Sequence, residues 1–388
     1  MSQIEEHRSE RYSVFPSAPL QKLHDASSEW TDRVADSHNL KLAAAFTHMS
    51  TWLSESPLGD DEYGAATTSD FLGTWELTNV GEPNQGQLFF HVQGRWEYGP
   101  PGPETLGPLN LGTLVGTANT FGEYVPTFLL RNLYWQQGSQ EAGWVFRAGK
   151  ITPDATMSTS AHIAAPLTFV TIAGTGPFAN ALTDSGLGIV ATWFVNDRFK
   201  VMGLVSDANA DRFNFGDITE GDFYSAVEFA YKFAPRTEKA GYSKLALWHT
   251  DPTKDGEPVN GHIGGQGGYG FFLKHEQELT DDGRAVALFR YGKSYNDSAL
   301  YNYQFGAHFF LYNPTKSGIQ NDLLAVAVNW AQANVSGARL ESDFEIFYRF
   351  PMFPKVDVTL HYQSIFNLAL DPDNDHAAAF SIRLRTTF

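Results

Sequence analysis

The chain has 388 residues, a formal net charge of −17 and no cysteine. The negative charge argues against sequence-independent nucleic-acid binding, and the lack of cysteine excludes thiolate metal sites and cysteine nucleophiles. No stretch approaches the roughly 20 apolar residues that a membrane-spanning helix needs, although aromatic residues make up a high 14% of the sequence.

The N-terminal part is expected to form a lead of residues 1–38 before the main domain, residues 39–388. Leu20, Leu23, Trp30 and Val34 recur at helical spacing, and Ser17 stands where it can cap the helix, so we expect a short helix over 18–37. A disordered or tethering lead is the alternative. The first 15 residues lack the basic end and apolar run of a signal peptide, so we expect a processed or re-engineered chain.

From residue 39 onward, runs of alternating apolar and polar residues are separated by Gly, Pro, Asn and Asp clusters. They predict an all-β fold, a transmembrane antiparallel barrel of about sixteen strands, whose outward aromatic residues would form girdles at the two membrane interfaces. The predicted strands lie near 40–53, 69–79, 86–98, 127–137, 142–151, 186–196, 199–207, 222–233, 241–250, 268–280, 283–293, 299–313, 322–333, 339–351, 356–366 and 376–388.

The two faces of these strands differ in polarity, because successive side chains point to opposite sides. In the third strand Phe90 and Val92 oppose Gln93 and Arg95, and in the fifth the apolar alternate positions leave Arg147 on the polar face. Charges in the middle of a strand need a water-filled lumen. The fourth strand, 127–137, is ambiguous because both of its faces mix apolar and polar residues.

The connections alternate between short and long, as in outer-membrane barrels. Turns such as 196–198, 281–283 and 353–354 are expected on the periplasmic side, as is the N-terminal lead 1–38, and loops 99–126, 152–185 and 251–267 are expected on the outer side. The turn near 312–321 is longer than this pattern requires. The third outer loop, 152–185, is the longest, and we expect it to fold inward and narrow the pore.

The last strand alternates from Phe380 to the C-terminal Phe388, so its lipid-facing side stays apolar to the end. This arrangement is typical of the strand that closes an outer-membrane barrel. The terminal Phe388 is similar to the sorting signal read by the bacterial barrel-assembly machinery.

Several motifs, in this order and spacing, resemble the carbohydrate-selective porin family of OprB type, over about residues 65–388. They are GTWELTN (73–79), RNLYWQQ (131–137), FRAGKITPD (146–154), LVSDANAD (204–211), GYGFFLKHEQEL (268–279), ALFRYG (287–292) and SDFEIFYRF (342–350). The resemblance implies a bacterial outer-membrane barrel through which glucose-like sugars diffuse passively into the periplasm. It also implies a monomer rather than a trimer, with outer-membrane lipid and lipopolysaccharide as neighbours.

Pores of this family are constricted by inward-folded loops and lined with arginine, acidic and aromatic side chains. The residues that the resemblance assigns to this constriction are Arg95, Glu97, Arg131, Trp135, Arg147 and Arg290. Arginine suits a sugar because its rigid fork carries five donors, and binding must stay weak so that the solute can leave.

Three other functions stay open on the sequence alone. A channel for small organic or sugar acids would use the same arginines. An outer-membrane barrel enzyme would need a serine or aspartate constellation that no motif marks, and a soluble lectin-like sandwich would need no detergent. We expect no cofactor and no metal: the acidic loop 371–375 lacks the glycine and terminal glutamate of a calcium loop.

Overall fold

The computed structural model of the protein describes residues 13–15, 17–99, 101–119, 121–122, 127–210, 212–233, 240–253, 265–315 and 321–388. Parts of the predicted loops 99–126 and 251–267 and of the turn 312–321 lie outside these ranges. Within them, no helix is both long and apolar enough to cross a membrane.

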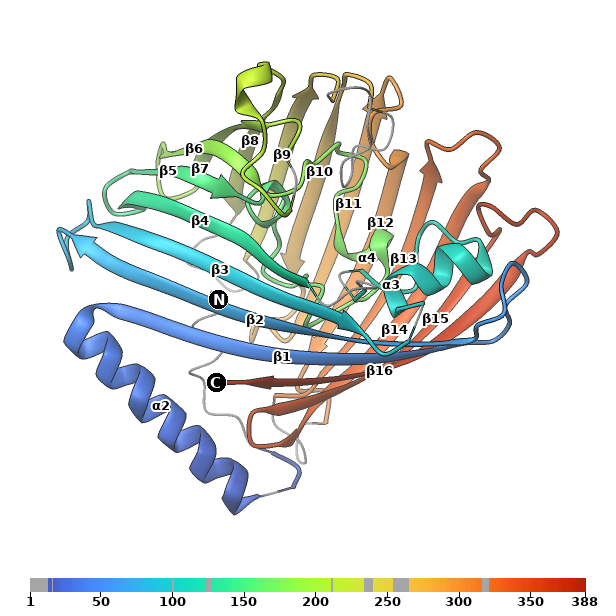
Figure 1. The fold of residues 1–388 in the computed structure, drawn as a ribbon, viewed down its shortest axis with the longest axis horizontal. Coiled ribbons are helices and arrows are strands. Elements are labelled where there is room, and N and C mark those ends of the chain that lie inside the picture. Colours follow the sequence, from blue (N-terminus) through green and yellow to red (C-terminus); the bar gives the residue numbers. More distant parts are fainter. Residues whose placement is uncertain are drawn as a thin grey trace.

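Sixteen antiparallel strands form one closed barrel in sequence order, and β1 pairs with β16 to close it (Figure 1). The predicted fold class is therefore confirmed. The strands are β1 (Leu40–Leu53), β2 (Tyr63–Thr78), β3 (Gly86–Glu97), β4 (Thr127–Ser139), β5 (Trp144–Ile151), β6 (Gly186–Phe194), β7 (Phe199–Asp207), β8 (Phe223–Phe233), β9 (Gly241–Thr250), β10 (Gly268–Glu278), β11 (Ala285–Tyr295), β12 (Tyr301–Tyr312), β13 (Leu323–Ala333), β14 (Leu340–Phe353), β15 (Val356–Phe366) and β16 (His376–Thr387).

The barrel has two unlike ends. Connections such as 140–143, 195–198 and 354–355 are short and define the short-turn end, whereas the connections after β3 and β5 are long and define the long-loop end. These long connections carry the small helices α3 (Pro103–Leu106), η1 (Gly107–Leu111), η2 (Pro153–Ala155) and α4 (Ile172–Thr175), and η3 (Ile218–Glu220) follows β7.

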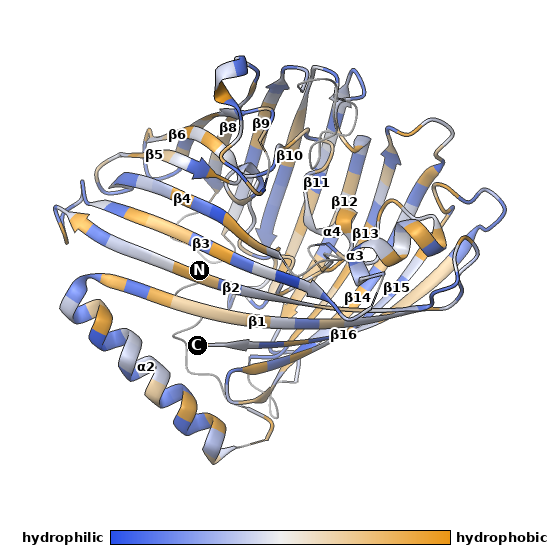
Figure 2. Cartoon of the chain, in the orientation of Figure 1, coloured by the Kyte–Doolittle hydropathy of each residue, from blue (hydrophilic) through white to orange (hydrophobic). Residues whose placement is uncertain are grey.

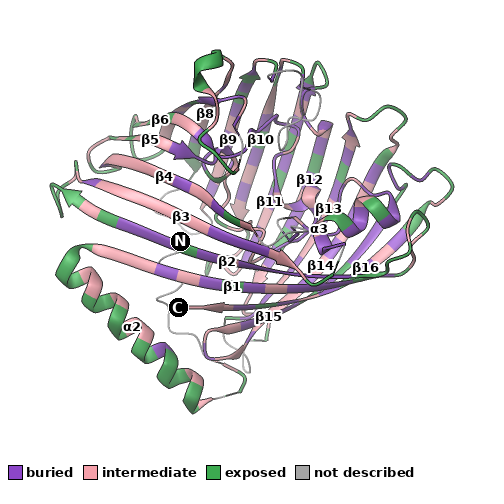
Figure 3. Ribbon diagram, viewed as in Figure 1, coloured by how far each residue is buried: buried purple, intermediate pink, exposed green. Residues whose placement is uncertain are grey.

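Side chains alternate between the lumen and the outer wall along each strand, which Figure 2 shows as alternating colours. In β16, Phe380 and Leu384 are exposed on the outer wall, while Ser381, Arg383 and Arg385 are buried inside. Figure 3 shows buried positions alternating with less buried ones along many of the strands.

Helix α2 (Ala18–His38) precedes the barrel and agrees with the predicted helix over 18–37. Ser17 is its N-cap residue, but the Ser17 side chain makes no capping hydrogen bond, so the expected cap is wrong in this respect. The helix lies beside the rim of the short-turn end, close to the start of β1 (Figure 1).

Candidate functional site

Two loops fill much of the lumen. L2, between β3 and β4, and L3, residues 152–185 between β5 and β6, both turn inward, as Leu106, Phe169 and Ala173 show by being fully buried. The loops also bind each other, since the Ala173 N–H donates to the Val115 carbonyl at 3.2 Å. The structure therefore places the third long loop inside the barrel.

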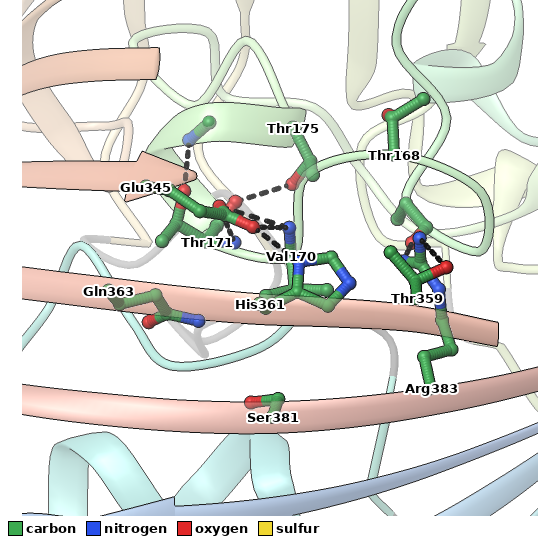
Figure 4. A network of polar contacts seen from close by, with 12 residues as sticks. Thr168, Val170, Thr171, Thr175, Glu345, Thr359, His361, Gln363, Ser381 and Arg383 are labelled. Atoms are coloured by element: carbon green, nitrogen blue, oxygen red, sulfur yellow. Dashed lines mark hydrogen bonds and ion pairs between the residues drawn. The ribbon is translucent and has the colours of Figure 1, made fainter. Parts of the chain in front are cut away.

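Glu345 of β14 holds the middle of L3 against the wall. Its carboxylate, which is fully buried, accepts the N–H groups of Val170 at 3.0 Å and Thr171 at 3.2 Å. Nδ1 of His361 lies 2.9 Å from the same carboxylate (Figure 4). Two backbone donors that a loop would otherwise leave unpaired in the interior are thus satisfied by one side chain.

Neighbouring strands extend this attachment along both loops. The further contacts are Gln304 to the Ala173 and Gly176 carbonyls, Arg349 to the Leu167 carbonyl, Arg383 to the Ala165 carbonyl, and the Leu114 and Val115 N–H groups to Glu341.

The opposite wall holds the beginning of L3. The Ser158 N–H donates to Glu228 at 2.6 Å, and Lys244 donates to the Thr159 carbonyl at 2.8 Å. Lys274 donates to the Ser158 carbonyl at 3.2 Å. L3 therefore crosses the lumen from β8–β10 to β12–β16 and divides it.

A cavity of about 330 Å³ remains between L3 and the barrel wall, to which β2, β3, β4, β10 and β11 contribute. Its lining mixes apolar groups with polar ones, and the polar ones include two carboxylates, three cationic side chains, and several amides and hydroxyls. These side chains are Asp70, Asp154, Arg131, Lys274, Arg290, His91, Gln93, Asn119, Asn132, Ser158, Thr159, Ser160 and Thr175, with Phe178 and Phe272 as aromatic neighbours.

Hydrogen bonds on β2 and β3 order one side of this cavity. Arg95 Nε donates to Gln93 Oε1 at 2.7 Å, and Gln93 Nε2 donates to Asp70 Oδ1 at 2.8 Å. His91 Nε2 lies 2.8 Å from the same Asp70 oxygen. Arg95 is therefore buried behind the lining and holds Gln93 in place.

Arg131 lies at a β-bulge in β4. The β3–β4 register pairs His91 with Asn132 and Val92 with Leu130, which leaves Arg131 without an opposite residue. A bulge re-aims side chains and shifts the alternation of the strand. Arg131 Nη1 thereby reaches Asp184 Oδ1 of L3 at 3.1 Å, and Arg212 Nε lies 3.1 Å from Asp184 Oδ2.

The bulge also shows that the prediction for Trp135 is wrong. Residues 131 and 135 share a face in an unbroken strand, but beyond the bulge Trp135 pairs with Leu88 and Ala148 on the outer wall. Its indole N–H donates to Gln137 at 3.2 Å. Trp135 thus offers no stacking surface to the lumen.

The remaining predicted residues lie at different depths. Arg290 lines the cavity and donates to the Gly176 carbonyl at 3.4 Å. Glu97 lies against the L2 backbone at Gly102 and Gly122, outside the cavity lining. Arg147 points inward but nearer the short-turn end, where it donates to Gln136 at 2.8 Å and lies 5.5 Å from the centre of the Tyr134 ring.

Three charged residues of the cavity lining, Asp70, Asp154 and Lys274, were not predicted, and neither was Asp184, the partner of Arg131. Asp70 and Lys274 occupy inward strand positions, and strand parity alone would have found them as lumen residues. Asp154 and Asp184 belong to L3, where no periodicity marks an inward side chain. The only sequence signal for them was the expected inward fold of the loop.

Asp154 combines burial with an incomplete set of partners. Its Oδ1 atom is buried and has no hydrogen-bond partner among the described residues. Burial raises the pKa of Asp154, the Arg131 guanidinium opposes this rise, and the Asp184 carboxylate adds to it. The carboxylate of Asp154 therefore takes up a proton at a higher pH than an ordinary aspartate.

This gives an expected pH dependence of ion selectivity. As the pH falls from neutral toward the raised pKa of Asp154, the cavity loses one negative charge and its electrostatic field becomes more favourable to anions. Because the raised pKa disfavours the charged form in the folded state, the same protonation stabilises the fold as the pH falls. Reversal potentials in a KCl gradient between pH 7 and pH 4 measure the change.

Asp154→Asn is the control for this titration, since it removes the charge and keeps the shape. We expect the variant to be shifted toward anions at pH 7 and to show a smaller change on acidification. Identical profiles for the two proteins would show that Asp154 does not control the field in the cavity.

A second cavity of about 480 Å³ follows on the short-turn side of L3. It shares Thr159 and Ser160 with the first cavity and is lined by Lys200, Lys232 and Glu276, among others. The two cavities thus adjoin along one segment of L3.

No family model and no curated protein sequence matches the chain. Among solved structures, the chain is similar to OprB of Pseudomonas putida at high pH, with a TM-score of 0.74 and 10% identity over 93% of this chain and 97% of that one. The chain has the fold of a porin.

Two further structures agree on this porin fold. OprB of Pseudomonas putida at low pH has a TM-score of 0.58 and 8% identity, covering 98% of this chain and all of that one. A double mutant of the Rh. blastica porin has a TM-score of 0.53 and 10% identity, covering 90% and 100%. The predicted resemblance to OprB-type porins is confirmed at the level of the fold.

Proposed function

We propose that the chain is an outer-membrane channel of the carbohydrate-selective porin family, through which sugars of monosaccharide size diffuse into the periplasm. Support for a channel comes from the porin fold, the apolar outer wall and the polar lumen. In this reading the short-turn end faces the periplasm.

The observation that carries the sugar specificity is the composition of the first cavity. Its walls present donors and acceptors to the same space, and three of its five charged side chains have ionic partners: Arg131 with Asp184, Lys274 with Glu276 at 3.0 Å, and Asp70 with His91. The hydroxyls of a neutral sugar both donate and accept hydrogen bonds, whereas the carboxylate of an organic acid only accepts them. The volume of about 330 Å³ falls at the lower end of the roughly 300–1,000 Å³ of small-molecule sites.

Transport also limits how tightly the sugar binds. A dissociation constant of about 1 mM, or about −4 kcal/mol, lets the solute leave for the second cavity. A channel for sugar acids or other small organic acids is the second candidate, because the cavity has three cationic side chains against two carboxylates.

The proposal includes the neighbours of the barrel. The outer wall would contact outer-membrane lipid and lipopolysaccharide, the barrel-assembly machinery would read the terminal Phe388, and the barrel would act as a monomer. No cofactor and no catalytic step enter this function.

Liposome swelling tests the proposal with glucose, a size-matched polyol, a disaccharide and a sugar acid. We expect glucose to enter faster than the polyol, because only the ring presents its hydroxyls in a fixed array to the cavity. Rates that follow size alone would indicate a general porin. Faster entry of the sugar acid would favour the second candidate, and no swelling would contradict a channel.

A further inference from the structure

Helix α2 follows the rim of the barrel at the short-turn end. The Val14 and Phe15 N–H groups donate to the Pro351 and Met352 carbonyls of β14 at 2.8 Å, and at the other end of the helix the His38 carbonyl accepts from Trp75 of β2 at 3.1 Å. From β14 to β2 the rim crosses β15, β16 and β1.

The dimensions agree with a helix that lies along this arc. The 21 residues of α2 extend over about 31 Å at 1.5 Å per residue. Four spacings of about 4.8 Å between strands inclined by roughly 40° cover about 25 Å of rim. Figure 1 shows α2 lying crosswise to the barrel, as a helix parallel to the membrane plane must.

The contacts of α2 place it on the outer side of the rim. His24 stacks on the ring of Phe388 at 5.3 Å, and Phe388 meets Phe46 edge-on at 6.3 Å. Phe46 and Trp75 point outward from the barrel and are 46% and 43% exposed. The helix therefore continues the apolar outer wall and does not close the mouth of the lumen.

Around its axis, α2 carries four kinds of surface in a fixed order. The face toward the barrel is formed by Leu20, His24, Ser27, Thr31 and Ala35, all buried or half-buried. The neighbouring stripe is apolar and exposed: Pro19, Leu23, Ala26 and Trp30, with Leu23 and Trp30 both 51% exposed. Next come the exposed cations Lys22 and Arg33, and then the acidic residues Asp25, Glu29, Asp32 and Asp36.

This order reproduces the layers at the surface of a bilayer. An apolar stripe suits the acyl chains, lysine and arginine reach the phosphates beside it, and carboxylates stay in water. Tryptophan is enriched at this depth, and the helix contacts the aromatic rings of the rim, through His24 at Phe388 and through the His38 carbonyl at Trp75. Figure 2 shows both hydrophobic and hydrophilic positions along α2.

We infer that α2 lies in the headgroup region of the periplasmic leaflet, with Leu23 and Trp30 against phospholipid acyl chains and its acidic face in the periplasm. The inference rests on the barrel spanning a membrane, but not on which solute it transports. The helix then serves as a collar that seals lipid around the seam where β1 meets β16.

The absence of native cysteine makes a direct test possible. Nitroxide labels on Leu23→Cys and Trp30→Cys probe the apolar stripe, and labels on Glu29→Cys and Asp36→Cys probe the acidic face. Leu384→Cys on the outer wall and Asp60→Cys in the loop after β1 are the lipid and water references. All six full-length variants are reconstituted in phosphatidylcholine vesicles containing phosphatidylglycerol, and their conductance shows that each barrel is folded.

Power saturation compares collisions with oxygen, which dissolves in lipid, and with a water-soluble nickel chelate. We expect the labels at 23 and 30 to resemble that at 384, and those at 29 and 36 to resemble that at 60. Equal access of the nickel chelate to all four helix positions would overturn the inference. Dipolar coupling between labels at position 30 of two molecules would overturn it in favour of a helix pair between copies.

Discussion

Replacing Glu345 with alanine is expected to release the middle of L3 from the barrel wall. The Val170 and Thr171 N–H groups would lose their buried acceptor, and His361 its carboxylate partner. Breaking a buried charged contact of this kind costs about 3 kcal/mol, which corresponds to a roughly hundredfold rise in local opening. Amide hydrogen exchange of the segment 165–176 measures this rise directly.

The same variant is expected to carry a larger and noisier single-channel current, because L3 divides the lumen. Glu76→Ala is the matched control: Glu76 is also an inward glutamate with an ionic partner, Lys41, but it lies at the short-turn end and does not contact L3. Exchange in 165–176 should stay unchanged in Glu76→Ala. If Glu345→Ala left both exchange and current as in the parent protein, the other contacts of L3 would be sufficient to hold it.

The barrel itself was predictable because its information is local. Successive side chains of a strand point to opposite faces, so the face of one residue fixes the faces of its neighbours. A run of about ten residues therefore reveals both the strand and which of its side chains face the lumen. The predicted β2 nevertheless began six residues late, at 69 rather than Tyr63. Small residues occupy this start, and L2 packs so closely on Gly64 that a side chain would meet the Pro101 carbonyl. Small residues at this start make room for the loop, but they show little alternation of apolar and polar side chains, so the sequence pattern did not predict a strand there.

The site was less predictable because its decisive contacts are not local. Asp184 reaches Arg131 across 53 residues, and Val170 reaches Glu345 across 175. The bulge at Arg131 adds a further difficulty, since no glycine or proline marks it in the strand 127–137. Trp135 and Arg131 were therefore assigned to one face when they occupy two.

Under the proposed function, removing the guanidinium of Arg131 is expected to abolish most of the preference for glucose over a polyol of equal size. Arg131 lines the cavity from the bulge, and its partner Asp184 keeps a second cation in Arg212. The loop contact thus survives in Arg131→Ala while the donors facing the solute are lost. A charge-assisted hydrogen bond contributes about 1.5–3 kcal/mol, so half-saturation by glucose should rise about tenfold or more.

Arg147→Ala is the matched comparison for this change, because both arginines point into the lumen from adjacent strands. Arg147 lies outside the lining of the first cavity. Its guanidinium donates a hydrogen bond to Gln136 and lies over the Tyr134 ring. Its loss should alter the conductance for small ions and leave the ratio of glucose to polyol entry within twofold of the parent value, or about 0.4 kcal/mol. Equal losses of selectivity in the two variants would mean that the lumen selects through its overall charge. A loss confined to Arg131→Ala would assign the selection to the cavity between L3 and β4.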